Sequence, residues 1–147
     1  MRFHHEATLS VAPDEVWRVL TDWERQAEWM PDVAWLRVLG PDRGLGARIA
    51  VRTKVVGMPM VTDQLQVTTW DPPRRLAVRH IGLVGGSGRW VLRPAPGGRT
   101  TLVWTEELRM PPPVLGDLAL WLYGPVQRWM LRRSVRNLTR LLASGAA

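Results

Sequence analysis

Residues 11–31, VAPDEVWRVLTDWERQAEWMP, predict two short helices in succession. Pro13 suits the first turn of a helix, and the side chains of Asp14 and Glu15 complement the positive end of the helix dipole. Apolar residues follow at helical spacing as far as Leu20, where we expect the first helix to end.

The second short helix is expected between Thr21 and Pro31. Thr21 and Glu24 have the spacing of a capping box, in which each side chain accepts a hydrogen bond from a backbone N–H at the start of the helix. One helical face is apolar and consists of Trp23, Ala27 and Met30. Pro31 lacks a backbone N–H and is expected to end this helix.

The segments around these helices alternate between apolar and polar residues. Residues 3–11 show this two-residue period, which is typical of a half-buried strand. After Pro31, glycine- and proline-rich turns such as GPDRGLG (40–46) separate further segments of the same kind. We expect six strands there, over residues 33–40, 45–56, 60–70, 75–82, 88–95 and 100–109.

A long helix is expected over residues 114–143. Its second half carries an apolar stripe beside a ridge of arginines. The stripe consists of Leu131, Val135, Leu138 and Leu142, and the ridge of Arg128, Arg132, Arg136 and Arg140. Gly124 and Pro125 interrupt the pattern, so we expect a kink or a separate short helix before them, because proline removes one backbone hydrogen bond.

This order of elements is that of the helix-grip fold, an α+β architecture in which a seven-stranded, curved antiparallel sheet wraps around the last helix. Four stretches resemble the polyketide cyclase/dehydrase-like branch of the START-related (SRPBCC) superfamily. They are ATLSVAPDEVWRVLTDWERQAEWMPDV (7–33), WDPPRRLAVRH (70–80), GSGRWVLRPAPGGRTTLVWTEEL (86–108) and LRRSVRNLTRLL (131–142). The resemblance covers the whole chain, so we expect one domain over residues 1–147.

The resemblance implies a cavity between the sheet and the last helix that holds a hydrophobic small molecule, such as a lipid or a polyketide-like chain. It implies no shared catalytic residue, because similar proteins include cyclases, carriers of hydrophobic ligands and quinone-binding factors. The chemistry must therefore be sought in the residues themselves.

Strand alternation predicts which polar side chains face the cavity. His80 has the same parity as Leu76 and Val78 on its strand. Glu106 has the same parity as Leu102 and Trp104 on another strand. A buried histidine beside a buried carboxylate is a candidate catalytic acid/base pair. His5 and Thr53 have inward parity as well, and His5 is a candidate ligand contact. Simple structural pairing with backbone groups or water is the alternative for each of them.

Aromatic and aliphatic residues supply further candidates for ligand contact. Trp90 and Trp104 have inward parity on their strands, and Trp29 and Trp35 flank Pro31 near the expected mouth of the cavity. On the last helix the candidates are Leu118, Leu122 and Tyr123. Packing in the protein core is the alternative for each residue.

Several kinds of site are not supported. The sequence contains no cysteine, which excludes disulfides, thiolate metal ligands and cysteine nucleophiles. His4 and His5 are adjacent on a strand and point to opposite faces, and His80 is distant in sequence, so we expect no metal site. Residues 82–88, GLVGGSG, lack the lysine of a phosphate-binding loop. We therefore expect no cofactor.

The sequence also bears on location and partners. Residues 1–10 lack the apolar segment of a signal peptide, and the most apolar window, residues 114–126, is shorter than the roughly 20 residues of a membrane helix. We expect a cytoplasmic protein without integral membrane association. The net charge is +7, but many arginines alternate with apolar residues as solvent-facing strand residues do, so we expect no nucleic-acid partner.

Three functions remain open at this point. The first is a protein, monomeric or homodimeric, that binds a hydrophobic or aromatic small molecule. The second is a cofactor-independent cyclase or dehydratase in which His80 and Glu106 transfer protons. The third is an interaction protein that uses its basic last helix, and this function predicts binding that weakens steeply with salt.

Overall fold

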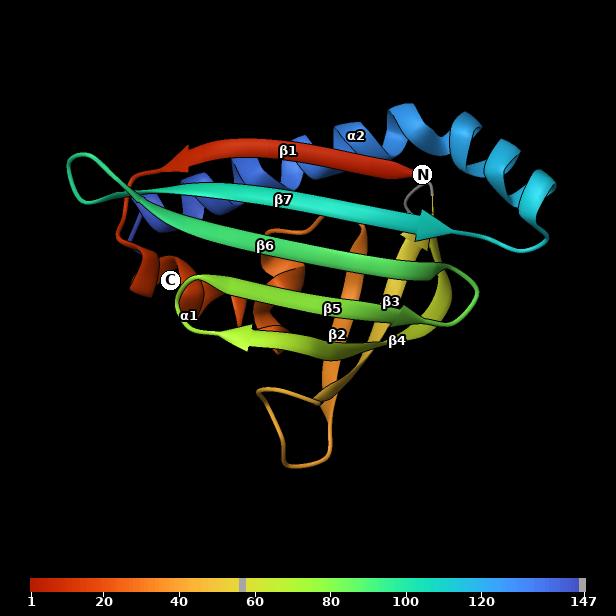
Figure 1. The fold of residues 1–147 in the computed structure, drawn as a ribbon, viewed down its shortest axis with the longest axis horizontal. Coiled ribbons are helices and arrows are strands. Elements are labelled where there is room, and N and C mark those ends of the chain that lie inside the picture. The colour runs from red at the N-terminus through yellow and green to blue at the C-terminus, as the bar shows by residue number, and fades with distance from the viewer. Residues whose placement is uncertain (56–57, 146–147) are drawn as a thin grey trace.

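Seven strands form one antiparallel sheet in the computed structural model, which describes residues 1–55 and 58–145. Their order across the sheet is β1-β7-β6-β5-β4-β3-β2 (Figure 1). The strands are β1 (Arg2–Leu9), β2 (Val33–Leu39), β3 (Arg48–Val55), β4 (Met58–Asp71), β5 (Arg75–Ile81), β6 (Gly85–Ala95) and β7 (Arg99–Arg109). The six strands expected after Pro31 are confirmed to within three residues at their described ends; residue 56, the expected end of one of them, lies outside the described residues.

Two short helices follow β1, as expected, but the second differs in kind. Helix α1 (Pro13–Leu20) has the predicted bounds, whereas η1 (Trp23–Glu28) is a 3-10 helix. The predicted capping box is wrong, because the hydroxyl of Thr21 donates a hydrogen bond to the carbonyl oxygen of Trp17, 2.8 Å away. Thr21 therefore completes the end of α1 and does not cap η1.

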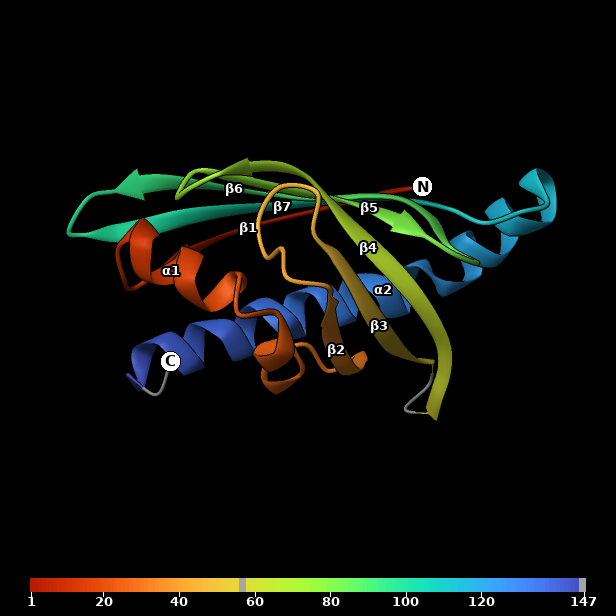
Figure 2. The ribbon, with the colours of Figure 1, turned by 90° about the horizontal axis from the view of Figure 1, so that it is seen from below.

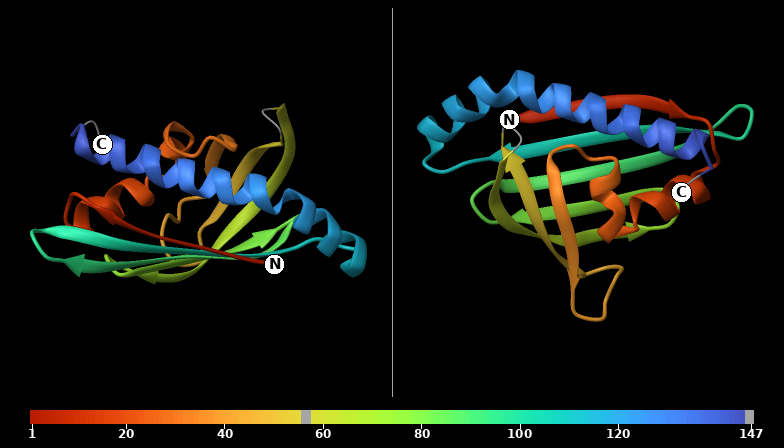
Figure 3. Two further views of the ribbon diagram at one scale, coloured as in Figure 1. Left: turned by 90° about the horizontal axis from the view of Figure 1, so that it is seen from above. Right: turned by 180° about the vertical axis from the view of Figure 1, so that it is seen from behind.

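The sheet curves around helix α2 (Pro113–Ala143). Figures 2 and 3 show α2 on one side of the sheet, with β2, β3 and the far end of β4 rising beside it. Shifts of register interrupt the pairing of β2 with β3, of β3 with β4 and of β4 with β5. Such bulges bend and twist a sheet locally, which favours this curvature. The predicted helix-grip architecture is confirmed.

Helix α2 is one element and not two. It continues through Pro125, so a separate preceding helix was a wrong expectation. Its axis bends (Figure 1), as expected of a helix that contains a proline. At its start, Gly116 lies so close to the carbonyl oxygen of Met110 that a Cβ atom would overlap it. This contact with the segment after β7 fixes which face of α2 turns toward the sheet.

The core lies between the sheet, the short helices and the second half of α2. The predicted apolar stripe of α2, from Leu131 to Leu142, is buried. Trp17 packs edge-on against Trp70 with ring centroids 5.0 Å apart. Burial of a large apolar side chain stabilises a fold by about 1.5–3 kcal/mol, so this end of the molecule is held firmly by packing.

Candidate functional site

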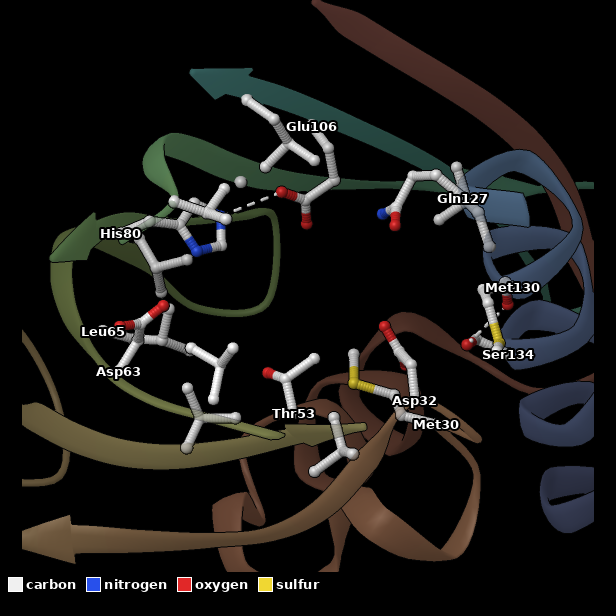
Figure 4. Close-up of a pocket in the computed structure, with 18 of the residues that line it drawn as sticks. Met30, Asp32, Thr53, Asp63, Leu65, His80, Glu106, Gln127, Met130 and Ser134 are labelled. Carbon is white, nitrogen blue, oxygen red and sulfur yellow. Dashed lines mark hydrogen bonds and ion pairs between the residues drawn. The ribbon is translucent and has the colours of Figure 1, made fainter. Parts of the chain in front are cut away.

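A cavity of about 450 Å³ lies between the concave face of the sheet and α2. This volume is in the range of small-molecule sites. The side chains around it come from η1, the segment after it, six of the strands and α2 (Figure 4). Most of them are apolar, and Trp23, Trp90 and Trp104 give the wall an aromatic part.

A histidine and a glutamate meet on the sheet side of this cavity. Nε2 of His80 lies 3.0 Å from Oε2 of Glu106, and the other carboxylate oxygen of Glu106 accepts a hydrogen bond of 2.8 Å from the indole N–H of Trp104. Both residues line the cavity and are largely buried. With the proton on Nε2, Glu106 holds His80 in the tautomer whose Nδ1 can accept a proton.

A glycine on the strand between them makes this pair possible. His80 is on β5 and Glu106 on β7, and Gly88 of β6 is the residue directly opposite Glu106. A Cβ atom at position 88 would lie 2.7 Å from Oε1 of Glu106. The absence of a side chain at Gly88 thus leaves the space that the carboxylate occupies.

Asp32 supplies a second acidic group, which follows η1 and faces the cavity (Figure 4). Burial, and after it the negative charge of Glu106, raise the pKa of the Asp32 carboxyl, while Lys54 acts in the opposite direction. Burial and the charge of Asp32 also raise the pKa of Tyr123. The charge of Glu106 thus acts on Asp32, and the charge of Asp32 acts on Tyr123.

Other polar side chains of the wall bond to nearby backbone groups. The amide of Gln26 donates to the carbonyl oxygen of Leu20, and the hydroxyl of Ser134 donates to that of Met130. Asp63 accepts a hydrogen bond from the backbone N–H of Leu83 at 3.1 Å. These bonds fix the polar groups in place in a mainly apolar wall.

The structure places several predicted site residues at the cavity. His80, Glu106, Trp90, Trp104 and Tyr123 all line it, and so does Thr53. Trp29 does not belong to this lining. It is buried behind the wall, with its ring centroid 6.1 Å from those of both Trp90 and Trp104.

Two strand residues lie away from the cavity. Trp35 is not among the lining residues, and the guanidinium of Arg37 stacks 4.5 Å from its ring centroid. A register shift between Val33 and Trp35 breaks the alternation, so that Leu36 is the next buried residue. His5 also lies outside the lining; burial and then the charge of Arg132 on α2 lower its pKa.

The prediction for two leucines of α2 is wrong. Leu118 is 51% exposed and Leu122 65% exposed, and neither lines the cavity. Gly116 contacts Met110, so the face of α2 that carries Gly116 turns inward and the face that carries Leu118 and Leu122 turns outward. That inner face includes Leu120, Tyr123, Gln127, Met130, Leu131 and Ser134.

The sequence reasoning missed further lining residues. Asp32 and Gln127 were not singled out, and neither were Asp63 and Ser134. Asp32 lies between η1 and β2, where neither helical nor strand periodicity applies. Gln127 and Ser134 follow Gly116 at helical spacing, so the small and polar residues of α2 contained a signal that a search for apolar residues overlooked.

Neither a metal-binding cluster nor a helix fit to cross a membrane occurs in the described residues. Within residues 1–55 and 58–145, no group of three or more His, Cys, Asp or Glu side chains is placed to hold a metal ion. In the same part of the chain, α2 and the shorter helices fall below the length and apolar character that crossing a membrane requires.

Comparison with protein families gives one match across nearly the whole chain. A family described as "Polyketide cyclase / dehydrase and lipid transport" matches residues 1–143. Among curated proteins, none matches this sequence.

Solved structures share the fold at low sequence identity. The ZhuI aromatase/cyclase from Streptomyces sp. R1128 is 21% identical with a TM-score of 0.80, over 95% of this chain and 91% of that protein. A protein from Thermus thermophilus is 19% identical with a TM-score of 0.80, over 100% of both chains. A START superfamily protein from Mycobacterium smegmatis is more distant, at 13% identity and a TM-score of 0.70, over 96% of this chain and 98% of that one.

Proposed function

Because this chain belongs to the polyketide cyclase/dehydrase and lipid transport family, we propose that it binds a hydrophobic or aromatic small molecule between the sheet and α2. The observation that carries the proposal is the cavity of about 450 Å³ with its mainly apolar wall. Trp90 and Trp104 offer aromatic surface to a ligand. Polar groups held in place by hydrogen bonds, such as Glu106, can fix the orientation of the ligand. The ligand is of the lipid or polyketide-like class.

We test this function by denaturing freshly purified protein and identifying the released small molecules by mass spectrometry. A stoichiometric hydrophobic compound is expected. In Val78→Trp, where a larger side chain fills the cavity from β5, this compound should be absent. Val103→Trp is the matched control, since Val103 lies on the opposite face of β7 from Trp104. Release of the same compound from both variants would contradict the proposal.

A second candidate function is proton-transfer catalysis on the bound molecule. The contact of 3.0 Å between His80 and Glu106 favours it. Nδ1 of His80 is the proton acceptor in this scheme, and Glu106 stabilises the imidazolium that forms. No permanent cofactor is required for a reaction of this kind.

Binding and catalysis make different predictions for the same variants. If the protein is a cyclase or dehydratase, His80→Ala and Glu106→Gln should lower turnover by about 100-fold or more while ligand affinity holds. Unchanged turnover in both variants would leave binding as the function. We propose that the protein acts in the cytoplasm, as a monomer or homodimer.

A further inference from the structure

The cavity wall has a charge composition opposite to that of the whole chain. The chain contains 20 Lys and Arg against 13 Asp and Glu. Among the described residues that line the cavity, Asp32, Asp63 and Glu106 are carboxylates, and none is a lysine or an arginine. This wall is poorly suited to an anionic ligand, such as a fatty acid, because its fixed negative charges would repel the carboxylate.

The three carboxylates differ in the hydrogen-bond partners that the protein gives them. Glu106 has Trp104 and His80 as partners, and Asp63 has the backbone N–H of Leu83. Asp32 points into the cavity (Figure 4). Its carboxylate interacts with its own backbone N–H, and within the described residues Lys54 influences it without forming an ion pair.

The carboxylates of Asp32 and Glu106 carry like charges when ionised, and both residues line the cavity. Burial and the charge of Glu106 both disfavour the ionised form of Asp32. The Tyr123 hydroxyl also responds to the charge of Asp32. A positively charged group between the two carboxylates would replace this repulsion with attraction.

We propose that the ligand is a hydrophobic amine, with its protonated nitrogen between Asp32 and Glu106 and its apolar body against Trp90 and Trp104. This inference rests on the proposed binding function and specifies its ligand class. The ammonium donates charge-assisted hydrogen bonds to the carboxylates, and indole rings attract cations through their faces. The largely buried setting strengthens both interactions.

The test compares three probes of one shape by calorimetry: 1-naphthylmethylamine, 1-naphthylmethanol and 1-naphthoic acid. The amine should bind at least about tenfold more tightly than the alcohol, and the acid most weakly. Asp32→Asn should remove most of the advantage of the amine over the alcohol. Asp42→Asn, at an exposed position in the loop before β3, is the control and should bind like the native protein.

The outcomes separate the ligand class from the binding function. Equal affinities for the amine and the alcohol would overturn the inference, and so would an amine advantage that persists in Asp32→Asn. If the alcohol binds without preference for the amine, the binding function stands and only the ligand class is wrong. If none of the three probes binds, the proposed binding function is contradicted as well. A thermal unfolding curve confirms that each variant is folded.

A second inference rests on a different part of the molecule, the outer face of α2. In its first half this face exposes large apolar side chains, including Trp121 at 66% and Leu122 at 65% exposure. The set is Val114, Leu115, Leu118, Trp121, Leu122, Val126 and Trp129. Exposed apolar surface of this extent on one helix indicates an interaction site.

The same face becomes basic in the second half of α2. Its exposed side chains there are Arg128, Arg132, Arg133, Arg136 and Arg140. Asp117 is the last acidic residue of the sequence. Within the described residues none of these arginines forms an ion pair; the guanidinium of Arg133 stacks 5.3 Å from the ring centroid of Trp129.

From this pattern we infer that the outer face of α2 docks on an anionic lipid surface. A membrane interface accepts tryptophan and leucine side chains and attracts arginine through its anionic headgroups. Nucleic acid would leave the apolar half uncovered, and a second copy of this chain would add its own net charge of +7. Ala119 and Tyr123, in the apolar half, also line the cavity, so docking would place the cavity beside the lipid.

The test is cosedimentation of the full chain with vesicles. Binding is expected to vesicles that contain phosphatidylglycerol, to weaken with salt, and to be much weaker with phosphatidylcholine alone. Trp121→Gln with Leu122→Gln, or Arg132→Gln with Arg136→Gln, should each lower affinity by about tenfold or more. Leu45→Gln is the control, because Leu45 is 67% exposed in the loop before β3.

Three results would overturn this second inference. The first is the absence of binding to anionic vesicles at low salt, and the second is an equal loss of binding in the Leu45→Gln control. The third is a dimer in analytical ultracentrifugation that Trp121→Gln with Leu122→Gln converts to a monomer, without any binding to vesicles. That result would assign the outer face of α2 to a second copy of the chain.

Discussion

At the scale of single residues, the position of Glu106 depends on Gly88. In Gly88→Ala the new methyl group would lie 2.7 Å from the carboxylate, which must move. We expect the contact between His80 and Glu106 to be lost. The measurement is the nitrogen NMR chemical shift of His80 Nε2, which should change when this ring nitrogen loses Glu106 as its hydrogen-bond partner.

Ser87→Ala is the control for this experiment, because Ser87 is exposed on the same strand. Its His80 Nε2 chemical shift should match that of the native protein. An unchanged chemical shift in Gly88→Ala as well would show that Glu106 does not depend on the space at Gly88.

Asp32 makes a prediction for stability and pH. Because burial raises its pKa above the ordinary value of 3.8, the folded state takes up a proton more readily than the unfolded chain. Stability from this group is therefore present at low pH and is lost as pH rises through the raised pKa. The groups that share its surroundings are Glu106, Lys54 and Tyr123.

Asp32→Asn removes this loss of folding stability at higher pH, because asparagine does not ionise. We expect the variant to be more stable than the native protein at neutral pH, and the difference to shrink as the pH approaches 3.8. Urea unfolding at several pH values measures it. A native protein that is equally or more stable than Asp32→Asn at neutral pH would contradict the expected effect of burial.

At the scale of elements, the rotation of α2 depends on its first turn. In Gly116→Ala the new Cβ atom would overlap the carbonyl oxygen of Met110, so the start of α2 must move away from β7. We expect a loss of about 1–3 kcal/mol in the free energy of unfolding. Leu118→Ala, on the exposed face of the same helix, should change it by less than about 0.5 kcal/mol.

Elements differ in how well the sequence predicts them. Strand alternation placed His80 and Glu106 correctly on the inner face, because β5 and β7 are regular near these residues. Trp35 was expected at the cavity from its place near Pro31, and there a register shift between Val33 and Trp35 leaves Leu36 as the next buried residue. A bulge depends on the pairing with a neighbouring strand, which one strand's own sequence does not specify.

The helix errors have a related physical cause. Leu118 and Leu122 looked like cavity residues because they are apolar, yet a contact between Gly116 and Met110 decides which face turns inward. Thr21 fitted a capping box by spacing, but its hydroxyl bonds back to Trp17. In both cases a tertiary or local contact outweighed the pattern, and the element itself was still predicted at the right place.

At the scale of the whole molecule, charge and apolar surface are separated. The basic side chains of α2 lie outside, and acidic groups face a cavity without lysine or arginine in its described lining. Packing is uneven in the same way: the second half of α2 is buried on the core, while the first half exposes its apolar residues. A ligand would therefore add packing where the fold has least of it.

This asymmetry predicts that a bound ligand stabilises the fold as a whole. A ligand at about 100 times its Kd adds about 2.7 kcal/mol to the free energy of unfolding. For a chain of this length that corresponds to a rise in Tm of roughly 5–10 °C. Differential scanning calorimetry measures the shift, which Val78→Trp should abolish and Val103→Trp should retain. An equal shift in both variants would place the ligand outside the cavity, since only Val78 belongs to its wall.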